Sequence, residues 1–252
     1  MTTIAIVQAR MTSTRFPGKV LADLLGEPMV IRQLERISRS DVIDRIVLAT
    51  SSDPTDDVLA EVATQHGIEV VRGDLNDVLQ RFMQVMDIYN PDVVVRLTAD
   101  CPLASPQVID KVIEHFQSSH ADYVSNTMSP TYPDGLDVEV VKAEVLRRVA
   151  QLSTDAAERE HVTLGVYRRP ELFTIENVEN ATDLSDLRWT VDTKEDFEFI
   201  QKIYEDLYPK NPNFDMDSVL DYLLRNPECN RTTSDAKRNA ALDGIDTGVM
   251  NA

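Results

Sequence analysis

Short apolar runs alternate with amphipathic stretches through the first half of the chain. Continuous apolar runs are typical of buried parallel strands, whereas apolar positions recurring every three or four residues indicate helices. The expected strands are residues 4–8, 45–49, 69–72 and 92–97. The expected helices are residues 28–39, 54–66, 76–89 and 106–117. This order predicts an α/β fold with a doubly wound, mostly parallel sheet that carries helices on both faces.

The pattern becomes less regular after about residue 122. Further strands are expected at residues 122–125, 136–141, 173–178 and 187–191, and helices at residues 142–151, 155–169, 194–207 and 216–225. We therefore expect one domain over residues 1–226, in which residues 122–180 contain a small dimerisation lobe. Residues 227–252 are polar and poor in large apolar side chains, so a polar C-terminal tail is expected there.

Composition narrows the class of protein. No segment approaches the roughly 18 consecutive apolar residues of a membrane span, and the N-terminus does not resemble a secretion signal. Two cysteines do not make a disulfide framework, so both are expected to be reduced in a cytoplasmic protein. A net charge of -18 and a pI near 4.5 argue against nucleic-acid binding, which usually leaves a basic surface.

A basic loop follows the first expected strand in this acidic chain. Residues 8–19 read Gln-Ala-Arg-Met-Thr-Ser-Thr-Arg-Phe-Pro-Gly-Lys, and no Asp or Glu precedes Asp23. Open α/β sheets bind ligands at the carboxyl ends of their strands, which is where this loop begins. Arg10, Arg15 and Lys19 are spaced so that they can converge on a polyphosphate. The alternative is an exposed loop whose cations are only solvated.

The loop is not one of the common glycine-rich phosphate motifs. Ser13 stands where a Walker A loop needs its first glycine, and Val20 replaces the Ser or Thr that would hold magnesium. No G-x-G-x-x-G run occurs either. A chain with only eight glycines is expected to hold phosphates mainly with side chains.

Two aspartates are candidates for a magnesium site. Asp100 follows the expected strand at residues 92–97, and Asp192 follows the one at residues 187–191. Mg²⁺ prefers oxygen ligands and usually bridges to substrate phosphates. If these two strands lie side by side, both carboxylates meet at one metal ion. The alternative is that each aspartate caps the helix or turn that follows it.

Five segments in the same order resemble the cytidylyltransferases. They are the basic loop, Thr98-Ala99-Asp100-Cys101-Pro102, Tyr132-Pro133-Asp134-Gly135-Leu136-Asp137, Glu158-Arg159-Glu160-His161-Val162 and Trp189-Thr190-Val191-Asp192. The resemblance extends from about residue 3 to residue 225. It is closest to the spore-coat polysaccharide biosynthesis group, which is related to the enzymes that activate 3-deoxy-manno-octulosonate and sialic acids as CMP-sugars. It implies a sheet like that of the nucleotide-diphospho-sugar transferases.

The resemblance also implies roles for individual residues. Arg10, Arg15 and Lys19 would be catalytic and hold the phosphates of CTP, and Asp100 and Asp192 would hold Mg²⁺. The implied nucleotide site comprises Gln8, Ala9, Arg10, Ser13, Arg15, Lys19, Thr98 and Asp100. The implied sugar site comprises Arg81, Asp137, Glu139 and His161, and the residues around Asp137 and His161 would face either the sugar or a dimer interface.

The implied activity is that of a cytoplasmic, homodimeric enzyme joining CTP to an acidic sugar of the 2-keto-3-deoxy type. The products would be pyrophosphate and a CMP-sugar for surface glycan biosynthesis, without a nucleic-acid or membrane partner. The octulosonate-activating relatives carry Gly-Asp-Glu-Pro where this chain has Ala99-Asp100-Cys101-Pro102. The resemblance therefore does not imply that this chain uses the same sugar. A sugar carboxylate needs a further cation, and Arg81, Arg159 and Arg188 are the candidates.

Three other functions stay open from the sequence. The enzyme could be a nucleotidyltransferase that uses another base or a non-sugar alcohol. It could be a glycosyltransferase that consumes a finished nucleotide sugar. Such an enzyme would not need the cluster of Arg10, Arg15 and Lys19 to bind a triphosphate. A nucleotide-binding module without activity would have no need of paired metal carboxylates.

Overall fold

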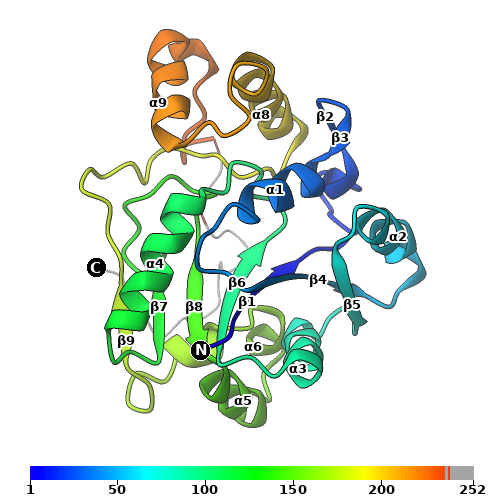
Figure 1. Ribbon diagram of the computed structural model, residues 1–252, viewed down its shortest axis with the longest axis vertical. Coiled ribbons are helices and arrows are strands. Elements are labelled where there is room, and N and C mark those ends of the chain that lie inside the picture. Colours follow the sequence, from blue (N-terminus) through cyan, green and yellow to red (C-terminus); the bar gives the residue numbers. More distant parts are fainter. Residues whose placement is uncertain (236–237, 239–252) are drawn as a thin grey trace.

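The computed structural model describes residues 1–235 and residue 238, and its centre is one twisted sheet between two layers of helices (Figure 1). The strands of this sheet lie in the order β5, β4, β1, β6, β8, β7, β9. Their bounds are β1 (Thr3–Gln8), β4 (Arg45–Ser51), β5 (Glu69–Gly73), β6 (Val93–Thr98), β7 (Tyr123–Ser125), β8 (Glu139–Lys142) and β9 (Ile175–Asn177).

Most of the sheet is parallel. β5, β4, β1 and β6 run in one direction, and β9 is parallel to β7. β8 is antiparallel to both of its neighbours, β6 and β7. The predicted α/β fold with a mostly parallel sheet is therefore confirmed, with β8 as the reversed strand. A separate two-stranded hairpin, β2 (Asp23–Leu24) and β3 (Glu27–Pro28), follows the basic loop.

Side chains of β1 alternate between the two faces of the sheet, as the pleat of a strand requires. Ala5 and Val7 belong to one buried cluster, whereas Ile4 and Ile6 belong to the other. Because helices cover both faces, the whole strand is apolar rather than alternating with polar residues.

Helices cover both faces of the sheet (Figure 1), and they divide between these two clusters. The first cluster contains residues of α1 (Met29–Ile37), α2 (Asp57–Gln65), α4 (Pro106–Ser118), α8 (Lys194–Leu207) and α9 (Met216–Arg225). The second contains residues of α3 (Val78–Tyr89), α5 (Ala143–Leu152) and α7 (Leu164–Tyr167). α6 (Ala156–Glu160) packs against α3. Three short 3₁₀ helices are η1 (Lys19–Leu21), η2 (Pro54–Asp56) and η3 (Pro227–Cys229).

Two elements differ from the sequence-based expectation. The helix expected at residues 155–169 is two short helices, because Val162 between them has a φ of 42°, which no α-helix accommodates. The strand expected at residues 187–191 makes only isolated bridges, Asp134 with Arg188 and Leu187 with Thr232. It is held instead by hydrogen bonds to loops on either side.

The region of the expected dimerisation lobe contributes directly to the sheet. β7, β8 and β9 all lie within residues 122–180 and extend the sheet beyond β6. A role of this region in dimerisation remains a prediction.

The beginning of the expected C-terminal tail makes defined contacts. Arg188 donates its backbone N–H to the carbonyl oxygen of Arg231 at 2.9 Å, and the Arg231 guanidinium is 3.0 Å from Asp196. The remainder of that tail, residues 236–237 and 239–252, lies outside the described residues. None of the helices described is both long enough and apolar enough to cross a membrane.

Candidate active site

A cleft of about 620 Å³ opens at the carboxyl ends of β1 and β6. Its walls come from the basic loop, α3, the loop after β6 and three later segments around residues 134–139, 160–161 and 188–192. Of the residues for which the sequence predicted a role, all but Arg159 line this cleft: Gln8, Ala9, Arg10, Ser13, Arg15, Lys19, Arg81, Thr98, Asp100, Asp137, Glu139, His161, Arg188 and Asp192. The fold thus brings the candidates together, while the role of each stays a prediction.

The basic loop is folded back on itself. Gly18 adopts a left-handed conformation (φ 73°) and donates its N–H to the carbonyl oxygen of Met11 at 3.0 Å. Met11 in turn donates its N–H to Asp56 Oδ1 at 2.6 Å, which ties the loop to η2. The loop leaves the Arg15 side chain half-exposed, but it buries Lys19. The alternative in which the loop cations are only solvated is therefore wrong for Lys19.

Lys19 joins the two candidate metal carboxylates. Its Nζ lies 3.2 Å from Asp100 Oδ2 and 3.1 Å from Asp192 Oδ1, and it donates to the carbonyl oxygen of Val191 at 2.6 Å. Burial lowers the pKa of Lys19, but the two carboxylates outweigh it and raise that pKa above its ordinary value. The lysine is therefore a cation at neutral pH.

The remaining carboxylate oxygens also have partners. The Thr98 hydroxyl donates to Asp100 Oδ1 at 2.6 Å. Arg188 donates to Asp192 Oδ2 at 2.7 Å, and Arg15 is 2.9 Å from Asp192 Oδ1. Burial raises the pKa of Asp100, yet Lys19 and the Thr98 hydrogen bond lower it below its ordinary value, so this group is ionised.

The two carboxylates offer oxygen ligands, which suit hard divalent cations such as Mg²⁺ and Mn²⁺. No cluster of three or more His, Cys, Asp or Glu side chains able to hold a metal is found in the part of the chain that the structure describes. Mg²⁺ is commonly bound by one or two carboxylates plus substrate phosphates and water, rather than by a full set of protein ligands. Asp100 and Asp192 supply that pair of oxygen donors beside the basic loop.

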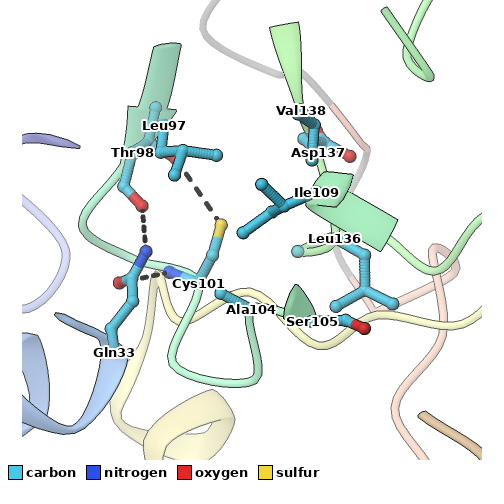
Figure 2. Close-up of a pocket in the computed structure, with 11 residues that line it drawn as sticks. Gln33, Leu97, Thr98, Cys101, Ala104, Ser105, Ile109, Leu136, Asp137 and Val138 are labelled. Carbon is cyan, nitrogen blue, oxygen red and sulfur yellow. Dashed lines mark hydrogen bonds between the residues drawn. The ribbon is translucent and has the colours of Figure 1, made fainter. Parts of the chain in front are cut away.

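Gln33 fixes the loop that carries Asp100, as Figure 2 shows. Its amide nitrogen donates to the carbonyl oxygen of Thr98 at 2.7 Å, and its amide oxygen accepts the backbone N–H of Cys101 at 3.3 Å. The cavity that these residues border is only about 10 Å³, room for one water molecule at most. Sequence reasoning missed Gln33, because one glutamine in an amphipathic helix gives no signal.

Cys101 is a packing residue rather than a nucleophile. It is buried, and both burial and the neighbouring Asp100 carboxylate raise the pKa of its thiol well above the ordinary range. A protonated thiol is a poor nucleophile and a poor metal ligand.

A second group of acidic residues lines the cleft on the β8 side. Asp134 is buried and accepts a hydrogen bond from Arg188 at 2.8 Å, while Asp137 is paired with Arg238. Burial, reinforced by the Asp137 charge, raises the pKa of Asp134 to about 6. Sequence reasoning quoted Asp134 within a motif but assigned it no role.

Glu139 is already fully engaged. It accepts hydrogen bonds from the hydroxyls of Tyr123 and Thr163, each at 2.6 Å, and pairs with Arg96. Arg96 also donates to Gln8 at 3.0 Å and lines the cleft, although its position inside a strand gave no reason to select it. Glu139 therefore orients Arg96 rather than presenting a free carboxylate.

Among the three carboxylate-binding candidates, Arg81 has two buried donors without a hydrogen-bond partner among the described residues, whereas Arg188 has one, its Nε. Arg159 is paired with Asp77, and Arg188 is held by aspartates. Arg81 is 1% exposed, lines the cleft, and has no hydrogen-bond partner for Nε and Nη1 among the described residues. Burial and the nearby Arg10 charge lower its pKa.

His161 lines the cleft at the end of α6. Burial and the neighbouring Arg96 charge lower its pKa below the ordinary value, so its imidazole is neutral at pH 7. A neutral imidazole can accept or donate a hydrogen bond to a polar ligand.

A basic loop after β1 and two carboxylates beside it, at the carboxyl edge of a mixed α/β sheet, together have the form of a nucleotidyltransferase site. Comparison with known families gives the same class. A family model described as "Cytidylyltransferase" matches residues 4–235. The chain belongs to the cytidylyltransferase family, as the sequence motifs indicated.

Individual relatives agree with this placement. The spore coat polysaccharide biosynthesis protein SpsF of Bacillus subtilis is 34% identical over 232 residues, covering 88% of this chain and 94% of that protein. A 3-deoxy-manno-octulosonate cytidylyltransferase of Chlorobium chlorochromatii is 36% identical over 136 residues, 53% of each chain. The structure of a cytidylyltransferase from Leptospira borgpetersenii superposes with a TM-score of 0.86 at 29% identity, covering 91% of this chain and 96% of that one.

Proposed function

We propose that this cytidylyltransferase joins CTP to a sugar acid of the 2-keto-3-deoxy type, giving a CMP-sugar for surface glycan biosynthesis. The anomeric hydroxyl of the sugar attacks the α-phosphorus of CTP, a new P–O bond forms, and the bond to the departing pyrophosphate breaks. The observation that carries this proposal is one cleft holding three loop cations beside two aspartates. Cations are needed to bind a triphosphate, and carboxylates are needed to bind its metal ion.

Each part of the nucleotide site has a separate task. Arg10, Arg15 and Lys19 donate hydrogen bonds to the phosphates and stabilise the charge that develops on pyrophosphate. The hydroxyl and backbone groups of Gln8, Ala9, Ser13 and Thr98 line the same wall. Mg²⁺, held by Asp100 and Asp192, would offset the charge of the phosphate oxygens.

Three observations support a sugar acid. Arg81 lines the cleft and has donors without a hydrogen-bond partner among the described residues, and a guanidinium binds a carboxylate through two parallel hydrogen bonds. Asp137 and His161 add hydrogen-bonding groups for sugar hydroxyls on the other wall. The relative from C. chlorochromatii is named for octulosonate, itself a sugar acid. Because Cys101 follows Asp100 here, the particular sugar is left open.

We also infer that the enzyme works as a homodimer in the cytoplasm. Leu152 and Leu172 are large apolar side chains that are 41% and 39% exposed, and both lie in the region expected to contain the dimerisation lobe. A contiguous exposed apolar patch is a feature of protein interfaces, and in this proposal the two leucines contribute to one. Light scattering on the purified protein, with Leu152→Asp as the disruptive variant, tests this assembly.

Pyrophosphate release tests the activity. CTP, UTP, ATP and GTP are each offered with a 3-deoxy-2-keto sugar acid and, separately, with neutral sugar 1-phosphates, in the presence of Mg²⁺. We expect release with CTP and the sugar acid, and none in an Asp100→Asn variant. Turnover with the sugar 1-phosphates alone would show that the acceptor is a neutral sugar phosphate rather than a sugar acid. Turnover with another nucleotide in place of CTP would show that the base is not cytosine. Hydrolysis of a finished nucleotide sugar without use of any triphosphate would favour a glycosyltransferase.

A further inference from the structure

Lys19 belongs to the loop that would hold phosphates, but its ammonium lies between the carboxylates that would hold the metal. Its contacts are Asp100 Oδ2 at 3.2 Å, Asp192 Oδ1 at 3.1 Å and the carbonyl oxygen of Val191 at 2.6 Å. An ammonium has three N–H donors, so these three acceptors satisfy it completely. The side chain is 10% exposed, which leaves little competition from water.

The other contacts of the two carboxylates strengthen this arrangement. Arg15 and Arg188 reach Asp192 at 2.9 Å and 2.7 Å, so the two carboxylates contact three cations, of which Arg188 is also shared with Asp134 and Asp196. Mg²⁺ needs its ligands at about 2.0–2.1 Å, and a divalent ion at that distance would be strongly repelled by an ammonium on the same oxygens. A divalent cation can therefore join both carboxylates only if Lys19 moves.

This inference rests on the proposed function of the cleft. We propose that Lys19 is the internal counterion of Asp100 and Asp192, and that the cleft binds its divalent cation tightly only together with a polyphosphate. Phosphate oxygens offer Lys19 and the half-exposed Arg15 a new acceptor, and their movement toward the phosphates frees the carboxylates for the metal. By linkage, the metal then strengthens polyphosphate binding by the same factor.

Binding of Mn²⁺ without nucleotide, followed by the electron paramagnetic resonance of free Mn²⁺, tests the counterion directly. Lys19→Met removes the charge and keeps an unbranched side chain. We expect it to bind Mn²⁺ about tenfold or more tightly than the wild type, because the two carboxylates are then left with less positive charge. Adding Asp100→Asn to Lys19→Met should abolish the gain, which shows that the ion binds at this pair.

Lys194→Met is the matched control. Lys194 follows Asp192 by two residues, but its side chain is 76% exposed, and its ion pair among the described residues is a long one of 3.8 Å to Glu198. Its loss should change Mn²⁺ affinity by about twofold at most, since exposed ion pairs contribute little. Equal Mn²⁺ affinity of the wild type and Lys19→Met would overturn the proposal, as would an equal gain in Lys194→Met.

A measurement on the wild type covers the case in which Lys19→Met fails to fold. Inorganic tripolyphosphate is titrated into the protein with and without Mn²⁺, and circular dichroism monitors folding of every variant. We expect Mn²⁺ to strengthen tripolyphosphate binding about tenfold or more in the wild type. Equal binding with and without the metal would contradict the coupling. Neither experiment contains a sugar or requires turnover, so a failure of the proposed reaction would be recognised separately.

Discussion

Val191 donates its backbone N–H to the carbonyl oxygen of Asp100 at 2.8 Å, and the same oxygen accepts the Thr190 hydroxyl at 3.1 Å. These two hydrogen bonds join the loop after β6 to the segment that ends at Asp192. They fix the separation of the two carboxylates through the backbone rather than through the flexible side chains alone. The pair is therefore built to act as a unit.

Asp100→Asn and Asp192→Asn should each abolish measurable turnover, and the double variant should be hardly worse than either single one. Ligands of one ion act together, so removing the second costs little once the first is lost. Pyrophosphate release at saturating CTP and Mg²⁺ measures the effect, and EDTA should stop the wild type. Additive losses in the double variant would show that the two carboxylates have separate tasks.

Arg15→Ala should lower kcat/KM by about 10²-fold, the usual loss when one transition-state donor is removed. Its side chain is half-exposed, so the free energy of unfolding should change by no more than about 0.5 kcal/mol. Arg225→Ala, which removes an exposed arginine from α9, is the control and should keep full activity. Near-normal turnover in Arg15→Ala would exclude this residue from the phosphate site.

Gln33→Leu should lower kcat without a matching change in the KM for CTP, because Gln33 positions the Asp100 loop and touches no substrate in the proposed site. Losing hydrogen bonds to two buried backbone groups should also cost about 1–3 kcal/mol of unfolding free energy. Gln65→Leu on the exposed surface of α2 serves as the comparison. If both glutamine variants behave alike, Gln33 has no positioning role.

Asp134→Asn should stabilise the protein relative to the wild type as the pH rises. The pKa of Asp134 is raised from the ordinary value of 3.8 to about 6, so its stabilising contribution is complete below the unfolded pKa and lost as the pH rises through the folded one. The Asn variant does not titrate there. Between about pH 4 and pH 7 the free energy of unfolding of the wild type should therefore fall by about 1–3 kcal/mol relative to that of the variant.

Urea unfolding of both proteins at several pH values measures that difference. Asn can still accept the hydrogen bond from Arg188, so the comparison isolates the charge. A difference that stays constant across this pH range would show that Asp134 keeps an ordinary pKa.

Arg81→Met should raise the KM for the sugar acid about tenfold or more while changing the KM for CTP much less, because it removes a bidentate carboxylate donor. Arg159→Met is a suitable control, since Arg159 lies nearby on α6 but is paired with Asp77. Steady-state kinetics with each substrate varied in turn distinguish the two. A selective rise in the KM for CTP would instead assign Arg81 to the nucleotide.

The sequence predicted the sheet well because its buried strands are continuous apolar runs, which are visible without knowledge of their partners. It also indicated Asp100 correctly as a residue of the cleft, since a strand end has a defined place in an α/β sheet. The burial of Lys19 was not predictable. Its partners Asp100 and Asp192 are distant in sequence, and only the completed fold brings them to the loop.

The sequence also failed to predict two backbone conformations that are set by tertiary contacts. The segment around Trp189 has the composition of a strand, but it pairs through isolated bridges because its neighbours are loops. Val162 interrupts a sequence pattern that otherwise predicts one continuous helix. A valine in a sequence gives no indication that its φ will be positive. Both exceptions border the cleft.

The reversal of β8 has a consequence for how such a protein can diversify. Because β8 runs opposite to β6, its beginning, rather than its end, lies at the ligand edge of the sheet, where Glu139 is opposite Arg96. The connection that enters β8 therefore delivers Asp134 and Asp137 to the cleft, independently of the connections that leave β1 and β6. Insertions or substitutions in that one connection can reshape the far wall of the cleft while the basic loop after β1 keeps its geometry. A lineage can thus change one wall of its cleft without rebuilding the other.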